Sequence, residues 1–240
     1  MKEKLLNVGA LLLLSGALAQ TQTPAQPATP AAGLVTGTSC TGGDKNMDDL
    51  SRITQVVLQE RQGRDRGWWD QMRDCYWPDS VVRLSWFTGP GPEFVTRSEA
   101  MVKGGSLSMH RLGPPVIHLN GNRALVDLPA AIEAPTTWDG VRADLVSYAR
   151  IVYRLEQRDG EWRIATLDTI YERDTMIPAI PGQTVRVDPK ALEGKRRSYA
   201  LLALLLEQRG FPVGNDMLGD DQPQGVAAFY DQAFRWLNGS

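Results

Sequence analysis

The chain has 240 residues, of which 42% are hydrophobic, so it is long enough to fill one well-packed core. A net charge of -2 gives no electrostatic reason to expect nucleic-acid binding. Its two histidines and two cysteines lack metal-ligand spacing, and no Gly-rich phosphate loop or serine nucleophile elbow is present, so no metal and no cofactor are expected.

Residues 1–19 have the pattern of a signal peptide. Lys2 and Lys4 precede an apolar run of roughly 15 residues, which is shorter than the ~20 residues needed to span a bilayer. The run ends in Ala17-Leu18-Ala19, a small-x-small cleavage pattern. We therefore expect export to the periplasm or the extracellular space, without membrane insertion after cleavage, and the alternative is an uncleaved anchor.

Residues 20–45 are expected to form a flexible linker, because most of this stretch consists of Ala, Thr, Pro and Gln, which bury little apolar surface. The chain's cysteines, Cys40 and Cys75, both follow the cleavage site. In an oxidising compartment they would pair and attach the start of the domain to a helix. The alternative is two unrelated thiols, one of them buried.

Two helices are predicted next. Residues 47–61 carry apolar side chains on one face at helical spacing, and Gly63 is expected to end that helix. Asp65 stands where a second helix needs an N-cap, and the spacing of Trp69, Met72 and Tyr76 extends that helix to Pro78. The pair is predicted to form a helical hairpin.

Residues 80–87 alternate as a half-buried strand, which the Gly-Pro cluster at 89–92 ends in a loop. Thr96 and Glu99 have the spacing of a capping box, so a third helix is expected to begin there and to run towards His110.

Two hairpins follow. Residues 116–120 and 123–134 flank an Asn-Gly turn, and Pro129 places its strand at an edge or a bulge. Residues 143–174 then alternate as two long strands around a turn at 158–160. This order of elements predicts an α+β domain in which helices cover one face of a curved sheet.

Residues 175–240 are expected to form a C-terminal appendage of two helices. The first begins at Asp188-Pro189 and ends at Gly210, and the second begins near Gln222. Since the second helix lacks a basic rim beside its apolar face, packing on the core is favoured over membrane binding.

The order of several short motifs resembles a SnoaL-like domain of the nuclear transport factor 2-like superfamily over residues 46–174. The motifs are Asp65-x-x-x-Trp69-Asp70, Trp77-Pro78-Asp79, Gly121-Asn122-Arg123-Ala124, Tyr148-Ala-Arg150 and Arg158-Asp-Gly-Glu-Trp162-Arg-Ile164. The resemblance implies a cone-shaped, curved antiparallel or mixed sheet wrapped by the N-terminal helices, with a deep pocket at its open end. Its relatives include scytalone dehydratase, ketosteroid isomerases, polyketide cyclases and non-catalytic binding domains.

Against the dehydratase, Asp65 matches an Asp that reaches the pocket and His110 matches an acid/base His. Other positions depart from it. Its second catalytic His falls near Glu133-Ala134, its tyrosine before the Asp is Arg64, and its strand tyrosine corresponds to Leu84 or Ser85. The Ser and Asn of its central strand fall at about Tyr148 and Arg150. The resemblance therefore does not imply dehydration of the same substrate.

The candidate catalytic residues are His110, Asp65, Tyr148 and Arg150, with His110 as the acid/base and the last two as an oxygen-binding pair on one strand face. The candidate substrate-binding residues are Trp69, Tyr76, Trp86 and Glu133. Each has a structural alternative: a helix cap, a dipole partner, a polar outer face or ordinary core packing. Alternation directs the other histidine, His118, to solvent.

Three functions remain open. The chain could be a cofactor-free enzyme that isomerises, cyclises or dehydrates a small apolar molecule by general acid/base chemistry. It could instead be a non-catalytic exported domain that binds a hydrophobic ligand, or a scaffold that forms a homodimer through the outer face of its sheet. An open cavity with Asp65, His110 and Arg150 converging on it would favour the enzyme, and a filled cone would favour the scaffold.

Overall fold

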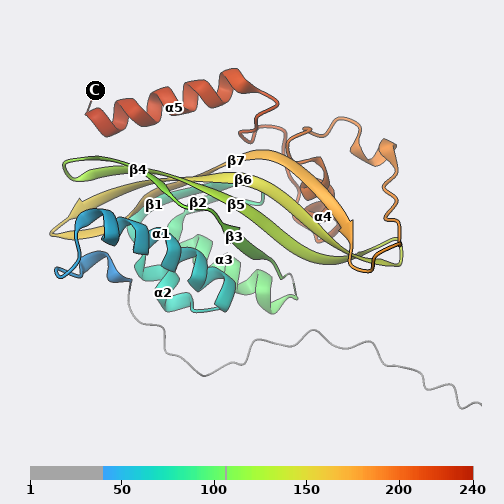
Figure 1. Ribbon diagram of the computed structural model, residues 1–240, viewed down its shortest axis with the longest axis horizontal. Coiled ribbons are helices and arrows are strands. Elements are labelled where there is room, and N and C mark those ends of the chain that lie inside the picture. The colour runs from blue at the N-terminus through green and yellow to red at the C-terminus, as the bar shows by residue number, and fades with distance from the viewer. Residues whose placement is uncertain (1–39, 106, 240) are drawn as a thin grey trace, which may run out of the picture. The chain divides into compact units, whose positions relative to one another are not determined.

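A curved, seven-stranded sheet dominates the computed structural model, which describes residues 40–105 and 107–239 (Figure 1). The expected signal peptide, 1–19, and residues 20–39 of the expected linker lie outside the described residues. No helix in the described part of the chain is both long and apolar enough to cross a membrane. The α+β class and the curved mixed sheet are as predicted.

The strands are β1 (Tyr76–Leu84), β2 (Phe87–Pro90), β3 (Met109–Leu112), β4 (Val116–Asn120), β5 (Arg123–Trp138), β6 (Val141–Arg158) and β7 (Glu161–Pro178). They are ordered β2-β1-β7-β6-β5-β3, and β4 also pairs with β5. Every pairing is antiparallel except that of β1 with β7, so the sheet is mixed. The predicted central hairpin is β6–β7, and the positive φ angles of Asp159 and Gly160 close its turn.

Alternating side chains of β6 separate the two faces of the sheet. Ile151, Tyr153 and Leu155 pack into the core formed with the N-terminal helices, and we call this the inner face. Val152 points the other way and packs against the last helix, on what we call the outer face. Because side chains alternate strictly along a strand, this assignment fixes the direction of every other residue on β6.

The inner face carries α1 (Asp49–Arg66), α2 (Trp69–Asp74) and α3 (Gly91–Lys103) (Figure 1). The prediction that Gly63 ends the first helix is wrong. A Cβ at Gly63 would lie 3.0 Å from the Cβ of Met72, so this glycine allows α2 to approach closely inside the helix. Gly67, with a φ of 72°, closes α1 instead.

Three other predicted boundaries shift. The second helix stops at Asp74, because the chain enters β1 at Tyr76. Helix α3 begins at Gly91 with a proline in its first turn, and Thr96 lies inside it rather than capping it. His110 belongs to β3, not to the end of α3. These changes place Asp65 in the last turn of α1, so it is not the N-cap of α2.

The C-terminal segment places one helix on each face of the sheet. The predicted helix after Asp188 is split into a short 3-10 turn, η2 (Pro189–Leu192), and α4 (Ala200–Gln208), with Gly194 at positive φ between them. Helix α4 packs on the inner face, and α5 (Pro223–Asn238) covers part of the outer face (Figure 1). A homodimer through that outer face stays a prediction, on a surface that α5 already occupies in part.

Cys40 and Cys75 lie together, as the predicted disulfide requires. Their sulfur atoms are 2.7 Å apart, and both residues are free thiols in this structure. Cys40 precedes the short helix η1 (Thr41–Gly43), and Cys75 follows α2. A covalent bond between them remains a prediction.

Candidate functional site

The centre of the site is a carboxylate and an imidazole that come from different layers of the fold. Asp65 in the last turn of α1 accepts a hydrogen bond from the backbone N–H of His110 in β3, at 2.7 Å. Its other oxygen lies 2.7 Å from Nδ1 of the same residue. Both side chains are more than nine-tenths buried. The predicted Asp65–His110 pair is therefore formed, with the imidazole fixed at two points.

The ion pair of Arg61 and Glu60 lies next to the imidazole. Arg61 donates two hydrogen bonds to Glu60, and its Nη1 lies 3.4 Å from Nε2 of His110. Glu60 is fully buried and also accepts hydrogen bonds from the hydroxyls of Tyr76, at 2.8 Å, and Tyr153, at 3.2 Å. Since guanidinium only donates, its approach favours the tautomer in which Nδ1 carries the proton and Nε2 bears the lone pair.

The buried environment also determines the charge of the pair. Burial, aided by the positive charges of Arg61 and Arg64, lowers the pKa of His110 below its ordinary value, although Asp65 opposes the shift. Burial would raise the pKa of Asp65, but its bonds with His110 and the charge of Arg61 outweigh this and lower it. At neutral pH the pair is therefore a neutral imidazole held by a carboxylate.

His110 lines an internal cavity between the inner face of the sheet and the helices. Its volume is about 70 Å³, enough for only several water molecules. The wall combines His110, Arg61 and Arg64 with Trp86 and with leucines from α4. Leu202, Leu205 and Leu206 of α4 line the cavity and pack against the inner face of the sheet. They occupy space in which a deeper pocket would otherwise extend.

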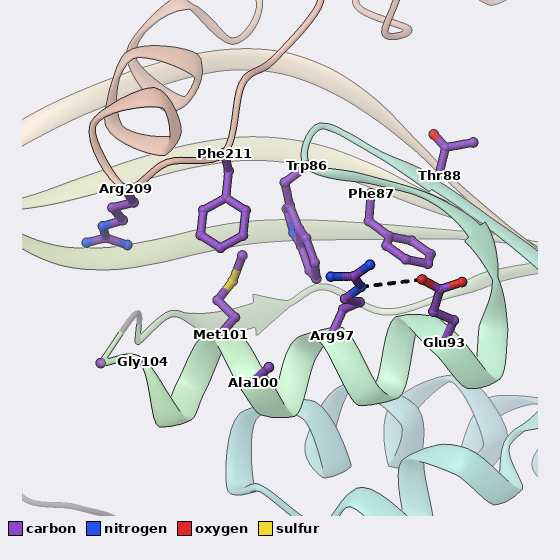
Figure 2. A pocket seen from close by; sticks show the side chains of 11 residues that line it. Trp86, Phe87, Thr88, Glu93, Arg97, Ala100, Met101, Gly104, Arg209 and Phe211 are labelled. Atoms are coloured by element: carbon purple, nitrogen blue, oxygen red, sulfur yellow. Dashed lines mark hydrogen bonds and ion pairs between the residues drawn. The ribbon is translucent and has the colours of Figure 1, made fainter.

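A wider groove lies next to this cavity, between α3, the β1–β2 connection and the segment after α4. It measures about 700 Å³. Figure 2 shows Trp86 and Phe211 facing Met101 of α3, with the Arg97–Glu93 ion pair further along the helix. Trp86, Met101 and Arg209 line both the groove and the cavity. Their side chains therefore form the partition between the buried histidine and the surface.

Tyr148 and Arg150 do not join this site, so the predicted four-residue centre is not formed. Both alternate with the inward Ala149 and Ile151 and therefore point to the outer face. Arg150 forms ion pairs with Glu172 and Asp220 and donates a hydrogen bond to the hydroxyl of Tyr230 in α5. Its guanidinium therefore lies on the side of the sheet opposite the cavity. Tyr148 lies under the guanidinium of Arg173. The predicted convergence of Arg150 with Asp65 and His110 is wrong.

The four predicted substrate-binding residues separate in the same way. Trp86 lines the cavity, as expected. Tyr76 is buried and bonds to Glu60, and Trp69 packs against the core, so neither belongs to the cavity wall. Glu133 points outward between the inward Ile132 and Ala134 and forms an ion pair with Arg111. His118, predicted to face solvent, is exposed and forms a T-shaped ring contact with Phe234.

Sequence reasoning missed the arginines of α1. Ile53 and Val57 mark the buried face of this helix, and the same face continues through Glu60, Arg61 and Arg64. Charged residues that continue an apolar stripe are a signal for a buried polar site. Among residues 40–105 and 107–239, no three or more His, Cys, Asp or Glu side chains gather in a metal-binding arrangement.

Comparison with known sequences places these residues in a family. The profile of the SnoaL-like domain family matches residues 45–168, a range that contains Asp65, His110 and the α1 arginines. A PEP2-like protein of Fusarium vanettenii is 30% identical over 208 residues, covering 82% of this chain and 89% of that protein. An uncharacterized protein of Emericella nidulans is 27% identical over 191 residues, covering 73% of this chain and 80% of its own.

Solved structures with a similar arrangement are more distant. A type 2 hexachlorocyclohexane dehydrochlorinase has 17% sequence identity and a TM-score of 0.48, over 56% of this chain and 96% of that one. The type 3 enzyme of Novosphingobium barchaimii has 17% identity and a TM-score of 0.46, over 58% of this chain and 96% of its own.

Proposed function

Because the chain belongs to the SnoaL-like domain family, we propose that it is a cofactor-free lyase or isomerase in which His110 removes a proton from a carbon atom of a small, largely apolar molecule. The observation that carries this proposal is the buried Asp65–His110 pair: His110 lines the cavity, and its unprotonated Nε2 lies 3.4 Å from Nη1 of Arg61. An imidazole that is neutral at pH 7 and held in one orientation suits a general base.

The proposed step needs only residues of the site. Nε2 takes the proton, and the electron pair of the broken C–H bond forms an enolate or expels a neighbouring hydroxide. Asp65 stabilises the imidazolium through Nδ1–H. Arg61 and Arg64 supply positive charge near the anion that develops on the substrate. The same arginines make the imidazolium a stronger acid, so it returns the proton to a carbon or to the leaving hydroxide, which departs as water.

The size of the cavity limits the substrate. Small-molecule sites usually measure about 300–1,000 Å³, whereas this cavity holds about 70 Å³. A substrate of more than a few heavy atoms therefore requires a shift of the partition residues Trp86 and Met101 or of α4. The adjoining groove offers the additional space.

The experiment that tests the proposal measures proton removal without a known product. Small ketones and β-hydroxy ketones are incubated with the protein in D₂O, and deuterium incorporation at carbon is followed by NMR. His110→Ala should reduce the exchange rate by ~10²–10⁴-fold, the usual loss for a general base. Asp65→Asn should reduce it less, and the exposed His118→Ala is the matched control. Equal rates in wild type and His110→Ala for every exchanging compound would contradict the proposal.

A non-catalytic ligand-binding or scaffold domain is the second candidate. The small volume of the cavity and the leucines of α4 that fill its end favour it. In that case no compound would show His110-dependent exchange, and His110→Ala would reduce stability alone.

We further propose that the protein acts after export. The support is the sequence pattern of residues 1–19. N-terminal sequencing of protein from its native host should find a mature chain that begins after Ala19, and a chain that begins at Met1 or Lys2 would contradict export with cleavage.

A further inference from the structure

Arg64 is a buried cation without a carboxylate partner. Its side chain belongs to the inward face of α1, and the residue is 4% exposed. Its hydrogen-bond contacts are both long: Nη2 lies 3.5 Å from the hydroxyl of Ser108 and 3.9 Å from the sulfur of Met101. By contrast, the neighbouring Arg61 is paired with Glu60. Among the described residues, no carboxylate forms an ion pair with Arg64.

This lack of a partner is unusual for a guanidinium. A buried charge is strongly destabilising unless it is paired or well hydrogen-bonded. Burial, together with the charge of Arg61, lowers the pKa of Arg64 to about 10, although the charges of Asp65 and Glu60 oppose the shift, so the group is still charged at pH 7. Arg64 lies in the cavity wall, so an anion inside the cavity could reach its guanidinium. The unpaired buried charge therefore marks an anion-binding position.

The other charges around the cavity leave this position positive. Asp65 is committed to His110, and Glu60 is committed to Arg61 and two tyrosines. Arg209, at the end of α4, lines the same cavity, and among the described residues its guanidinium donates a hydrogen bond to the carbonyl oxygen of Pro135 and to no carboxylate. The acidic groups are thus used within the protein, and two guanidiniums remain.

We infer that the cavity binds a monocarboxylic acid, with the carboxylate on Arg64 and the apolar part directed towards the groove past Met101. The guanidinium fork matches a carboxylate and supplies two parallel N–H donors. Met101 touches Arg64 and lines both the cavity and the groove, so its flexible side chain is the part of the wall that yields to the acid. This inference deepens the proposed function, on which it rests for naming the bound acid as the substrate.

The test compares acids with neutral amides of the same shape. Acetate, butanoate and benzoate are titrated against the protein by calorimetry, with acetamide, butanamide and benzamide as their partners. We expect at least one acid to bind at least tenfold more tightly than its amide, with an affinity that falls in Arg64→Gln by about ten- to a hundredfold. Arg64→Lys should retain part of it. Arg97→Gln, which removes a paired cation of the groove, is the control.

Two outcomes would overturn the inference. One is that all three acids bind no better than their amides, and the other is that Arg97→Gln abolishes acid binding while Arg64→Gln does not. Circular dichroism of each variant shows whether it is folded. If Arg64→Gln does not fold, the comparison is made with Arg64→Lys instead. The same titration in His110→Ala separates the two proposals. If the acid still binds to His110→Ala, but wild type and His110→Ala exchange carbon-bound protons at the same rate, the proposed function fails while the acid-binding site stands.

Discussion

One carboxylate, that of Asp65, holds both the backbone N–H and the ring Nδ1 of His110. The two residues are 45 positions apart, and the bonds join the last turn of α1 to β3. Because the carboxylate fixes Nδ1 as the donor, the ring can exchange a proton with the cavity only at Nε2. Titration of this ring is therefore the most direct probe of the site.

We expect His110 to titrate below its ordinary pKa of about 6.5, because burial disfavours the imidazolium. Asp65→Asn should lower the pKa further, since the carboxylate is the group that raises it. The measurement is the C2–H chemical shift of His110 against pH, with His118→Ala to assign the two histidine signals. Carbon exchange should show one acidic limb at the same pKa and a plateau above it.

The linked effect on stability has a definite sign. Since the folded pKa lies below the unfolded value, the unfolded chain takes up the proton first as pH falls. This group's contribution is therefore present above about pH 6.5 and is lost as pH falls towards the folded pKa. A His110 signal that titrates above 6.5, or one unaffected by Asp65→Asn, would contradict this account.

Glu60→Gln should destabilise the fold strongly. The change leaves Arg61 with a buried, unpaired charge behind His110, and breaking one partner of a buried pair is typically worth about 3–5 kcal/mol. Glu93→Gln removes a carboxylate from the exposed Glu93–Arg97 pair of α3, where about 0–1 kcal/mol is expected. Urea unfolding of both variants measures the difference. Equal effects would show that Glu60 is not required to compensate Arg61.

The sequence predicted strands better than it predicted the site. Alternation located β6 and β7 and their turn, since the pattern of each strand is local and repeats over many residues. The same alternation could have assigned Tyr148 and Arg150 to the face opposite Ile151, but the resemblance to a catalytic strand favoured the pocket. Asp65 and His110 were found through that resemblance, because no local pattern joins residues that meet only in the folded sheet.

Other features depend on tertiary contacts that no single segment encodes. Gly63 reads as a helix end, yet its lack of a Cβ allows α2 to pack there. From the sequence, the leucine-rich stretch of α4 is predicted to belong to a C-terminal appendage, yet its leucines line the cavity. In both cases the deciding partner lies on another element, so propensity and spacing give the wrong boundary or the wrong role.

Oxidation should convert the Cys40 and Cys75 thiols, whose sulfurs are 2.7 Å apart, into a disulfide. By loop entropy, a bridge that closes this segment would contribute about 3–4 kcal/mol. Protein made in an oxidising compartment, unfolded without reductant, should therefore resist thiol labelling, and the same protein after reduction should label at two sites. Cys40→Ser should match reduced wild type in urea. Labelling of both thiols before reduction would contradict the bridge.

Leu205→Ala should enlarge the cavity. Leu205 is buried on α4 and lines the wall, and truncation of a buried leucine typically destabilises a protein by about 2–5 kcal/mol. The exposed Leu50→Ala on α1 is the control, where little change is expected. Urea unfolding gives the stability, and NMR titration with benzene reports the new volume, since apolar cavities bind such molecules. Unchanged stability would show that α4 is not packed against the site.

Asp174 connects the state of α4 to pH. It lies on β7, and its Oδ2 accepts a hydrogen bond from the backbone N–H of Leu202 in the first turn of α4, at 2.9 Å. Burial raises its pKa to about 6, well above the value of about 3.9 expected in the unfolded chain. Between these values the folded protein keeps a proton that the unfolded chain releases, so this contribution to stability is present below about pH 4 and is lost as pH rises through 6.

Asp174→Asn keeps an acceptor for the Leu202 amide and removes the charge. The variant should therefore be more stable than wild type at pH 8, by about 2–3 kcal/mol. Its advantage should be nearly gone at pH 4, where the carboxyl of wild type is protonated in the folded protein and about half protonated in the unfolded chain. Urea unfolding at several pH values measures this, with the exposed Asp188→Asn, which changes the cap of η2, as the control. An advantage of the same size at pH 4 and pH 8 would mean that ionisation of Asp174 does not oppose the docking of α4.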